Sequence, residues 1–303
     1  MSSVEFQSVT KDFGDVRAVD HLTFSIPQGS IYGILGPNGA GKTTSLRMLM
    51  QIILPDSGTI RVFGQYQKNS YLDRIGYLPE ERGLYRKMKV NDVVAFFGEL
   101  HGIKPSDIRK RTTFWLERFD LLEWSNRKVE ELSRGMQQKL QFIITIFHEP
   151  DLIILDEPFT GLDPVNAQLV KDIIMEEHKR GATIIFSTHL MEQVEKLCDR
   201  ICLINKGQAI LEGKIQDIKQ KFGKNHLIVS YTGDSDFLSD SSIQAYNDYG
   251  NYVEILLAKE ANPQALLKKI VKQAEVYKFE LVEPSMHEIF IETVQSLGGD
   301  KNE

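Results

Sequence analysis

A glycine-rich segment that ends in one lysine and two threonines, GPNGAGKTT at residues 36–44, is the first candidate for chemistry in this sequence. It follows the apolar run SIYGIL and precedes SLRMLM, whose apolar residues recur at helical spacing. The spacing fits G-x-x-x-x-G-K-[ST], a loop between a strand and a helix whose backbone N–H groups surround phosphate oxygens. The candidate nucleotide-binding residues of this segment are Gly36, Pro37, Asn38, Gly39, Ala40, Gly41, Lys42, Thr43 and Thr44.

Three side chains of this loop have expected roles. Lys42 would contact the β- and γ-phosphates of a nucleoside triphosphate, and the Thr43 hydroxyl would be a ligand of Mg²⁺. Thr44 is expected only to help cap the helix that follows. A glycine turn with a chance lysine is the alternative, and the flanking strand and helix disfavour it. The segment therefore predicts a nucleoside triphosphate site.

Two acidic residues follow the apolar run Leu152 to Leu155 in PDLIILDEPFTGLDP, residues 150–164. The four apolar residues are typical of a strand buried on both faces of a parallel sheet. Asp156 can hold Mg²⁺ through the ion's water shell, and Glu157 can take a proton from the attacking water or orient it. The alternative, that these acids merely cap a strand end, is weakened by the phosphate loop upstream.

A second anion site is indicated by EELSRGMQQKLQFI, residues 130–143. Ser133 and the backbone of Gly135 stand where a helix is expected to begin, and helix N-termini favour anions. An ordinary serine-capped helix is the open alternative. Two phosphate-facing elements in one domain are explained if the second serves the nucleotide of another subunit.

Length and composition limit what surrounds these motifs. The chain has 303 residues and 42% hydrophobic side chains, enough for about two domains with a full core. Its longest uncharged apolar stretches fall well short of the roughly 18 residues that indicate a membrane span, and its start does not resemble a secretory signal, so a soluble protein is expected. Cys198 and Cys202 are expected to be buried thiols in a reducing cytosol. A net charge of −6 gives no support to nucleic-acid binding.

Five motifs together resemble one family. GPNGAGKTT, LSRGM, LIILDEP, GLDP and STH occur in the order and approximate spacing found in the ATP-binding subunits of ABC transporters. The resemblance covers residues 1 to about 215. It implies that two such domains sandwich two ATP molecules, each site joining the phosphate loop of one subunit to the signature helix of the other. That arrangement would explain the two anion sites.

The resemblance assigns further positions. Phe13 stands where these proteins place an aromatic that stacks on adenine, with Ala18 close by in sequence, although Phe13 could instead be ordinary core at a strand end. His189, in TIIFSTHL, stands at the switch histidine that contacts the γ-phosphate. Asp163, in TGLDP, resembles the loop acid that links the two sites across the dimer.

Two positions depart from the family pattern. The family's signature is usually LSGGQ, but this sequence has Arg134 in place of the first glycine and Met136 in place of the glutamine. The serine and the glycine that face the phosphate are retained. Glu80, in IGYLPEERGLY, replaces the usual glutamine of the loop that senses magnesium and the permease. Because an ionised glutamate only accepts hydrogen bonds, Glu80 is expected to bind Mg²⁺ or its waters. A solvent-facing acid within the EER cluster is the alternative.

The expected fold is α/β. Residues 1–215 would form a P-loop ABC ATPase domain with a helical subdomain at about 83–135, and residues 216–297 a small α+β domain, followed by a flexible tail at 298–303. The C-terminal domain resembles that of bacterial efflux-type ATPases, including the NatA-like group, chiefly through PSMHEIFIETV. Six aromatic residues of the helical subdomain are expected to be mostly core, or else to line a groove for a helix of a membrane partner. They are Phe96, Phe97, Phe114, Trp115, Phe119 and Trp124.

The resemblance implies a cytoplasmic ATPase subunit on the inner face of the membrane, which hydrolyses ATP with Mg²⁺ to drive export through a separate permease. One chain carries every motif, so a homodimer is the simpler expectation. A soluble regulatory ATPase of the same family, acting on a ribosome or a nucleic acid, is the alternative. Translation factors of that kind carry two ATPase domains and a charged linker, which this sequence lacks.

Overall fold

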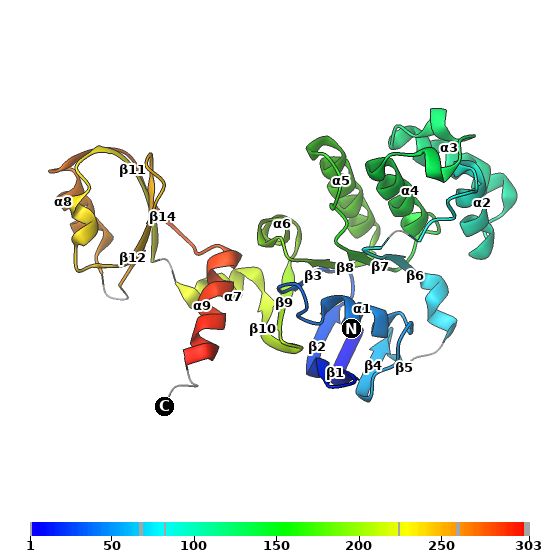
Figure 1. Cartoon of the computed structure of the whole chain (residues 1–303), viewed down its shortest axis with the longest axis horizontal. Coiled ribbons are helices and arrows are strands. Elements are labelled where there is room, and N and C mark those ends of the chain that lie inside the picture. Colours follow the sequence, from blue (N-terminus) through cyan, green and yellow to red (C-terminus); the bar gives the residue numbers. More distant parts are fainter. Residues whose placement is uncertain (1, 67–68, 82, 224, 259–260, 300–303) are drawn as a thin grey trace. The chain divides into compact units, whose positions relative to one another are not determined.

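The computed structural model describes residues 2–66, 69–81, 83–223, 225–258 and 261–299 (Figure 1). The chain divides into two compact units, Met1–Gly213 and Lys214–Glu303. The division falls just before the boundary expected at residue 215. Each unit has its own sheets and its own hydrophobic core.

An antiparallel sheet opens the first unit. Its strands run in the order β2-β1-β4-β5. Apolar side chains recur along β1 and β2 with gaps that mark one buried face, and Phe6 lies opposite Phe24 with ring centroids 4.5 Å apart. This face packs on the neighbouring sheet and on α1. The elements are β1 (Ser2–Phe13), β2 (Val16–Pro27), β4 (Ser57–Val62), β5 (Gln65–Tyr66) and α1 (Lys42–Leu49).

A second sheet of the first unit has the strand order β10-β9-β3-β8-β7-β6, and β9, β3, β8, β7 and β6 are parallel neighbours. Strands β3, β7 and β8 are buried along their whole length, which confirms the prediction for Leu152 to Leu155. Parallel strands end at the same edge of a sheet, and ligands of such sheets bind outside that edge. The strands are β3 (Ile31–Leu35), β6 (Ile75–Leu78), β7 (Leu152–Asp156), β8 (Thr183–Thr188), β9 (Arg200–Asn205) and β10 (Gln208–Lys214).

Helices cover this second sheet on both faces. Figure 1 shows α4 and α5 on one side of it, and α1 with the antiparallel sheet on the other. Cys198 and Cys202 are free and buried, as expected. None of the helices in the described part of the chain combines the length and the hydrophobicity that a membrane span requires. The remaining helices are α2 (Val90–Leu100), α3 (Pro105–Arg118), α4 (Arg134–Ile146), α5 (Pro164–Arg180) and α6 (Met191–Leu197), with short 3-10 turns at Asn69–Arg74, Leu122–Trp124 and Val129–Glu131.

Most aromatic residues of the helical subdomain are not core, so that prediction was wrong. Phe119 is buried, but Phe96 and Phe114 are 39% and 53% exposed, and the other three are half-buried. Aliphatic side chains such as Val93 and Leu116 fill the inner faces of α2 and α3 instead. Because a helix buries only one stripe, adjacent residues such as Phe96 and Phe97 cannot both face inward.

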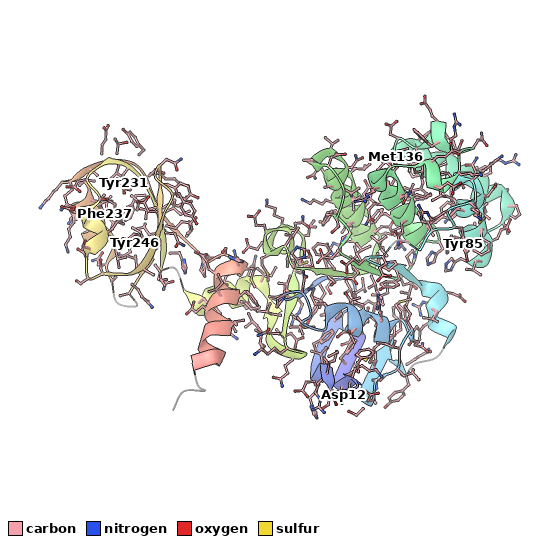
Figure 2. The ribbon with its side chains drawn as sticks, in the orientation of Figure 1. Asp12, Tyr85, Met136, Tyr231, Phe237 and Tyr246 are labelled. Atoms are coloured by element: carbon pink, nitrogen blue, oxygen red, sulfur yellow. The ribbon has the colours of Figure 1, made fainter. Side chains whose placement is uncertain are left out.

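The second unit is an antiparallel sheet, β12-β13-β11-β14, whose apolar face packs on α8. In Figure 2, Tyr231 and Phe237 lie together within it, with ring centroids 4.9 Å apart. Strand β12 was not predicted, because IQAYND is mostly polar and exposed. The expected tail is helical at residues 298 and 299, and residues 300–303 lie outside the described residues. The elements are α7 (Ile215–Phe222), β11 (His226–Gly233), β12 (Ile243–Asp248), β13 (Val253–Leu257), α8 (Pro263–Ile270), β14 (Ala274–Val282) and α9 (Met286–Gly299), with a 3-10 turn at Asp236–Ser239.

Candidate nucleotide-binding site

The phosphate loop joins β3 to α1, and two of its glycines touch neighbouring backbone. Gly36 and Gly41 have φ angles of 151° and 103°, which residues with a Cβ rarely adopt. A Cβ at Gly36 would lie 2.2 Å from the carbonyl oxygen of Ile204, and one at Gly41 would lie 2.4 Å from that of Ala18. Glycine at these positions therefore lets the loop pack against β9 and β2.

The side chain of Lys42 lies within this loop. Its ammonium donates to the carbonyl oxygens of Gly36 and Pro37 at 2.8 and 3.1 Å, and the residue is 7% exposed. Burial lowers the pKa of Lys42, and the nearby carboxylates of Glu157, Asp156 and Glu80 oppose that shift. A phosphate in the loop would give this ammonium a charged acceptor in place of neutral carbonyls.

Helix α1 begins directly at Lys42, with Gly41 as its N-cap and no side-chain cap. The expected capping by Thr44 was therefore wrong, because Thr44 is already the third residue of the helix. Ser45 donates its hydroxyl back to the carbonyl oxygen of Gly41 at 2.9 Å. The backbone N–H groups of the first turn remain available to an anion in the loop.

A cavity at the carboxyl edge of the second sheet brings together most of the candidate residues. Gly36 and Pro37, at the base of the loop, do not line it, and neither do Ser133, Gly135 or Asp163. Thr160 lines it and was not predicted; its only signal in the sequence is that it closely follows the two acids. The lining residues are Phe13, Ala18, Asn38, Gly39, Ala40, Gly41, Lys42, Thr43, Thr44, Glu80, Asp156, Glu157, Thr160 and His189.

Phe13 ends β1 at the rim of this cavity and is 51% exposed. The alternative that Phe13 is strand-end core was therefore wrong. The ammonium of Lys11 lies 5.5 Å from the centroid of the Phe13 ring. An exposed ring face beside the phosphate loop is suited to stacking on a flat base.

Asp156 lines the cavity and is 1% exposed. Neither of its carboxylate oxygens has a hydrogen-bond partner of normal geometry among the described residues. Burial raises the pKa of Asp156, and the hydroxyls of Ser187 and Thr43 partly counter this rise. A buried carboxylate whose nearby donors are poorly aligned hydroxyls is suited to a cation or a water molecule beside it.

The oxygen donors near Asp156 fit a magnesium ion. Thr43 and Glu80 line the same cavity, and all three side chains offer hard oxygen ligands. Within the described ranges, no group of three or more His, Cys, Asp or Glu side chains converges as a metal site. Magnesium does not require one, because it usually keeps several waters and is held by one or two carboxylates together with substrate phosphates.

Glu157 directly follows β7. It is held in place by Thr188, the last residue of β8, and by His189, the residue that follows β8. The hydroxyl of Thr188 donates to its Oε2 at 3.0 Å, and the backbone N–H of His189 donates to its Oε1 at 3.1 Å. Nδ1 of His189 lies 2.7 Å from the same Oε1. Glu157 has a φ of 51°, a strained conformation for a residue with a side chain. The candidate catalytic pair is thus in direct contact at the cavity wall.

Ser133 and Asp163 both cap helices outside this cavity. The Ser133 hydroxyl accepts from the backbone N–H of Met136 at 3.3 Å, so Ser133 stands at the start of α4 as expected and also forms the serine cap that was the open alternative. Asp163 accepts from the backbone N–H of Asn166 at 2.9 Å at the start of α5. A Cβ added to Gly135 would lie 3.3 Å from the carbonyl oxygen of Gly161, so the two helix starts approach closely.

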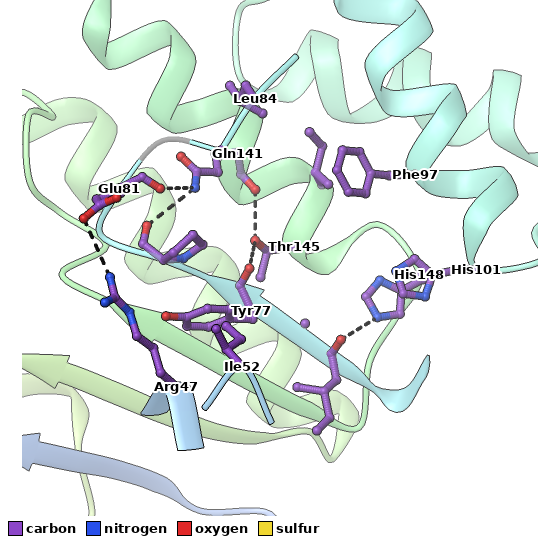
Figure 3. Close-up of a pocket in the computed structure, with 15 residues that line it drawn as sticks. Arg47, Ile52, Tyr77, Glu81, Leu84, Phe97, His101, Gln141, Thr145 and His148 are labelled. Carbon is purple, nitrogen blue, oxygen red and sulfur yellow. Dashed lines mark hydrogen bonds and ion pairs between the residues drawn. The ribbon is translucent and has the colours of Figure 1, made fainter. Parts of the chain in front are cut away.

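A second cavity lies beside the segment after β6 and between helices of the helical subdomain (Figure 3). Arg47 faces Glu81 across its mouth, with 3.7 Å between Nη2 and Oε1. Gln141 on α4 donates to the carbonyl oxygen of Glu81 at 3.3 Å. Of the six aromatic residues considered above, Phe97 lines this cavity. The other lining residues are Ile52, Ile75, Gly76, Tyr77, Pro79, Gly83, Leu84, His101, Ile144, Thr145 and His148.

Residues 19–160 match the family described as ABC transporter, and residues 213–294 match that described as ATP-binding protein DrrA1-3-like, C-terminal domain. The chain is similar to the uncharacterized ABC transporter ATP-binding protein YhaQ of Bacillus subtilis (strain 168), with 44% identity over 94% of this chain and 96% of that protein. It is also similar to the Nod factor export ATP-binding protein I of Paraburkholderia xenovorans (strain LB400), with 38% identity over 70% of this chain and 71% of that protein.

A solved structure described as the ATP-binding subunit of an ABC transporter superposes with a TM-score of 0.69. It covers 73% of this chain and 94% of its own, with 26% sequence identity. Its fold supports the expected α/β ABC ATPase architecture, and the match to residues 213–294 supports the expected C-terminal domain. The chain belongs to the ATP-binding subunits of ABC transporters, a family of ATPases.

Proposed function

We propose that this chain hydrolyses ATP in a nucleotide sandwich of two identical copies and thereby drives export through a separate membrane permease. ABC ATP-binding subunits partner with permeases and typically dimerise. Export is favoured because one relative, whose alignment covers 70% of this chain, is named for Nod factor export. The DrrA-like C-terminal domain agrees with the efflux-type resemblance of the sequence. The chain would lie at the cytoplasmic face of the membrane through its permease.

One observation supports the proposed sandwich of two copies. Ser133, Gly135 and Asp163 do not line the cavity that contains Lys42, although all belong to the same compact unit. The Ser133 hydroxyl, the Gly135 N–H and the N-terminus of α4 can therefore meet a nucleotide held by another copy. A single chain carries both halves of such a site, so two identical copies would form two complete sites.

Substrate binding uses the lining of the first cavity. Phe13 stacks on the adenine, with Ala18 beside it, and the N–H groups of the loop from Asn38 to Thr44 surround the phosphates, while Gly36 and Pro37 form the base of the loop. Lys42 exchanges its carbonyl acceptors for β- and γ-phosphate oxygens. Thr43, Glu80 and Asp156 would hold Mg²⁺, directly or through water. When bound, that ion neutralises charge on the phosphates during transfer.

Hydrolysis uses the pair at the cavity wall. The Glu157 carboxylate orients the attacking water and accepts its proton, and its side chain is held by Thr188 and His189. His189 contacts the γ-phosphate. Ser133 and the N–H of Gly135 from the second copy donate to the same phosphate, and Asp163 connects the two sites.

The second cavity is the proposed contact with the permease. Its wall includes the segment that carries Glu80 and Glu81, so a helix seated there would touch the loop that reaches the magnesium site. Phe97 and Leu84 give the apolar surface that a helix in a groove requires.

Affinity purification from membranes tests the transport assignment. A tagged chain, carried through mild detergent, should bring down a protein with several membrane spans, and the ATPase activity of the complex should respond to transported substrate. Phe97→Asp should abolish this co-purification and leave ATP binding by the isolated chain unchanged. Recovery of a ribosome or a nucleic acid in place of a membrane protein would contradict the assignment.

A further inference from the structure

A buried lysine, Lys139, lies on α4 shortly after the signature residues 132–136 and contacts the start of α5, the helix that follows the inter-site loop at residues 160–163. Lys139 is 7% exposed, and its ammonium donates to Oδ1 of Asn166, on α5, at 3.1 Å. Figure 1 shows α4 and α5 on the same face of the second sheet. Lysine is almost never fully buried unless it is paired, so this position requires an explanation.

Asn166 continues the chain of contacts to Asp163. Its side-chain amide nitrogen donates to Oδ2 of Asp163, while its backbone N–H donates to Oδ1. An ammonium only donates and a carboxylate only accepts, so the amide of Asn166 has one orientation that satisfies both neighbours. In the series Lys139–Asn166–Asp163, each side chain therefore donates its hydrogen bond to the next, and the series ends at Asp163 of the inter-site loop.

Two further contacts join the same segments. Gln138, the residue before the lysine, donates its side-chain amide to the carbonyl oxygen of Pro158 at 3.3 Å. Gly135 approaches the carbonyl oxygen of Gly161 so closely that a Cβ would lie 3.3 Å away. The first turns of α4 thus contact the segment from Pro158 to Asn166 at three places.

Electrostatics agree with this arrangement. Burial lowers the pKa of Lys139, and the carboxylates of Asp120 and Asp163 oppose the shift. Buried charges are weak evidence of stability, because apolar residues of similar size often replace them without loss. The neighbours of Lys139 on α4 are already buried, including Leu140 and Phe142.

We propose that Lys139 is a positioning residue that fixes the inter-site loop to the signature helix, so that Ser133, Gly135 and Asp163 approach the partner's nucleotide as one rigid surface. This inference rests on the proposed nucleotide sandwich. Lys139 touches no atom of the site itself and acts through Asn166. Lys139 does not affect the affinity of a single copy for ATP, and it contributes only to the association of two copies around ATP.

The test uses the full chain carrying Glu157→Gln, which is expected to bind ATP and to hydrolyse it very slowly. Lys139→Met removes the charge with similar length, Lys139→Arg restores a donor, and Asn166→Ala breaks the contact while leaving Asp163 its backbone partner. Lys110→Met, an exposed lysine of α3, is the matched control. Dimer formation is followed by size-exclusion chromatography over a range of ATP concentrations with Mg²⁺. ATP affinity of the monomer is measured separately at low protein concentration.

Lys139→Met and Asn166→Ala should each raise the ATP concentration for half-maximal dimer by about tenfold or more, the effect of losing one hydrogen bond to a charged group. Monomer affinity should stay unchanged, Lys139→Arg should recover most of the effect, and Lys110→Met should have none. The double variant Lys139→Met/Asn166→Ala should be no worse than the singles. Unchanged dimerisation in Asn166→Ala would overturn the inference, and so would equal effects of Lys139→Met and the control Lys110→Met. Failure of the Glu157→Gln parent itself to dimerise would overturn the sandwich, and this inference with it.

Discussion

Nδ1 of His189 lies 2.7 Å from Oε1 of Glu157, and the backbone N–H of His189 donates to that same oxygen at 3.1 Å. With the Thr188 hydroxyl on the other oxygen, the carboxylate has partners on both sides. The side chain that is proposed to activate water is therefore held by the end of β8 and by His189, the proposed switch histidine. A change at His189 should reach the chemistry through the position of Glu157 as well as through the γ-phosphate.

His189→Ala should lower kcat by about ten- to a hundredfold, because a charge-assisted hydrogen bond is lost at the reacting carboxylate. ATP affinity should change little, because the phosphate loop is untouched. Steady-state hydrolysis and equilibrium ATP binding separate the two effects. A kcat equal to that of the wild type would show that the contact has no part in turnover.

Lys42→Ala should abolish ATP binding, because the loop loses its one ammonium among otherwise neutral donors. Isothermal titration with Mg–ATP measures this directly. Lys110→Ala provides the control for general loss of a lysine. Tight ATP binding by the Lys42 variant at physiological magnesium would contradict the assignment of the loop.

Glu80→Gln should retain substantial ATPase activity and require more magnesium for it. The substitution keeps one oxygen ligand and the shape of the side chain, and it removes one negative charge from the cavity. Activity measured over a magnesium titration, with Mn²⁺ binding as a second readout, tests this. A total loss of activity at saturating magnesium would show that the carboxylate itself takes part in the chemistry.

The C-terminal unit should lose stability in acid through Glu288. Although burial raises the pKa of Glu288, hydrogen bonds from His226 and Ser285 lower it to about 2, against an ordinary value of 4.5. The folded pKa lies below the unfolded one, so the stabilisation is fully present above about pH 4.5 and is lost as pH falls towards 2. Glu288→Gln should therefore be less stable at pH 7 and decline less between pH 5 and 3, as measured by calorimetry. Parallel declines would contradict this account.

Local spacing predicted the parts of the site that a single segment encodes. The phosphate loop has its pattern within residues 36–44, and Asp156 and Glu157 follow a strand that is recognisable from four apolar residues. That these segments meet follows from the parallel sheet, whose strands end at one edge. The family resemblance supplied Phe13 and His189, which no local pattern singles out.

Features that depend on packing between segments could not be predicted in this way. Lys139 meets Asn166 only because α4 and α5 pack on one sheet face, and nothing in either segment indicates the pairing. The exposure of Phe96 and Phe114 depends on which stripe of each helix faces inward, and aromatic content alone does not determine it. The expected cap of α1 by Thr44 is absent, because Thr44 is the third residue of the helix and the N-cap position is occupied by Gly41, which has no side chain.

The most direct measurement is the behaviour of Glu157→Gln with ATP and magnesium. The variant keeps Lys42, Thr43 and Asp156 for binding, and it removes the carboxylate that is proposed to activate water. It should bind ATP with near wild-type affinity, hydrolyse it at least about a hundredfold more slowly, and elute from a sizing column as a dimer of identical chains with ATP but not with ADP. Near wild-type steady-state hydrolysis by Glu157→Gln, or a monomer at saturating ATP, would contradict the proposed mechanism.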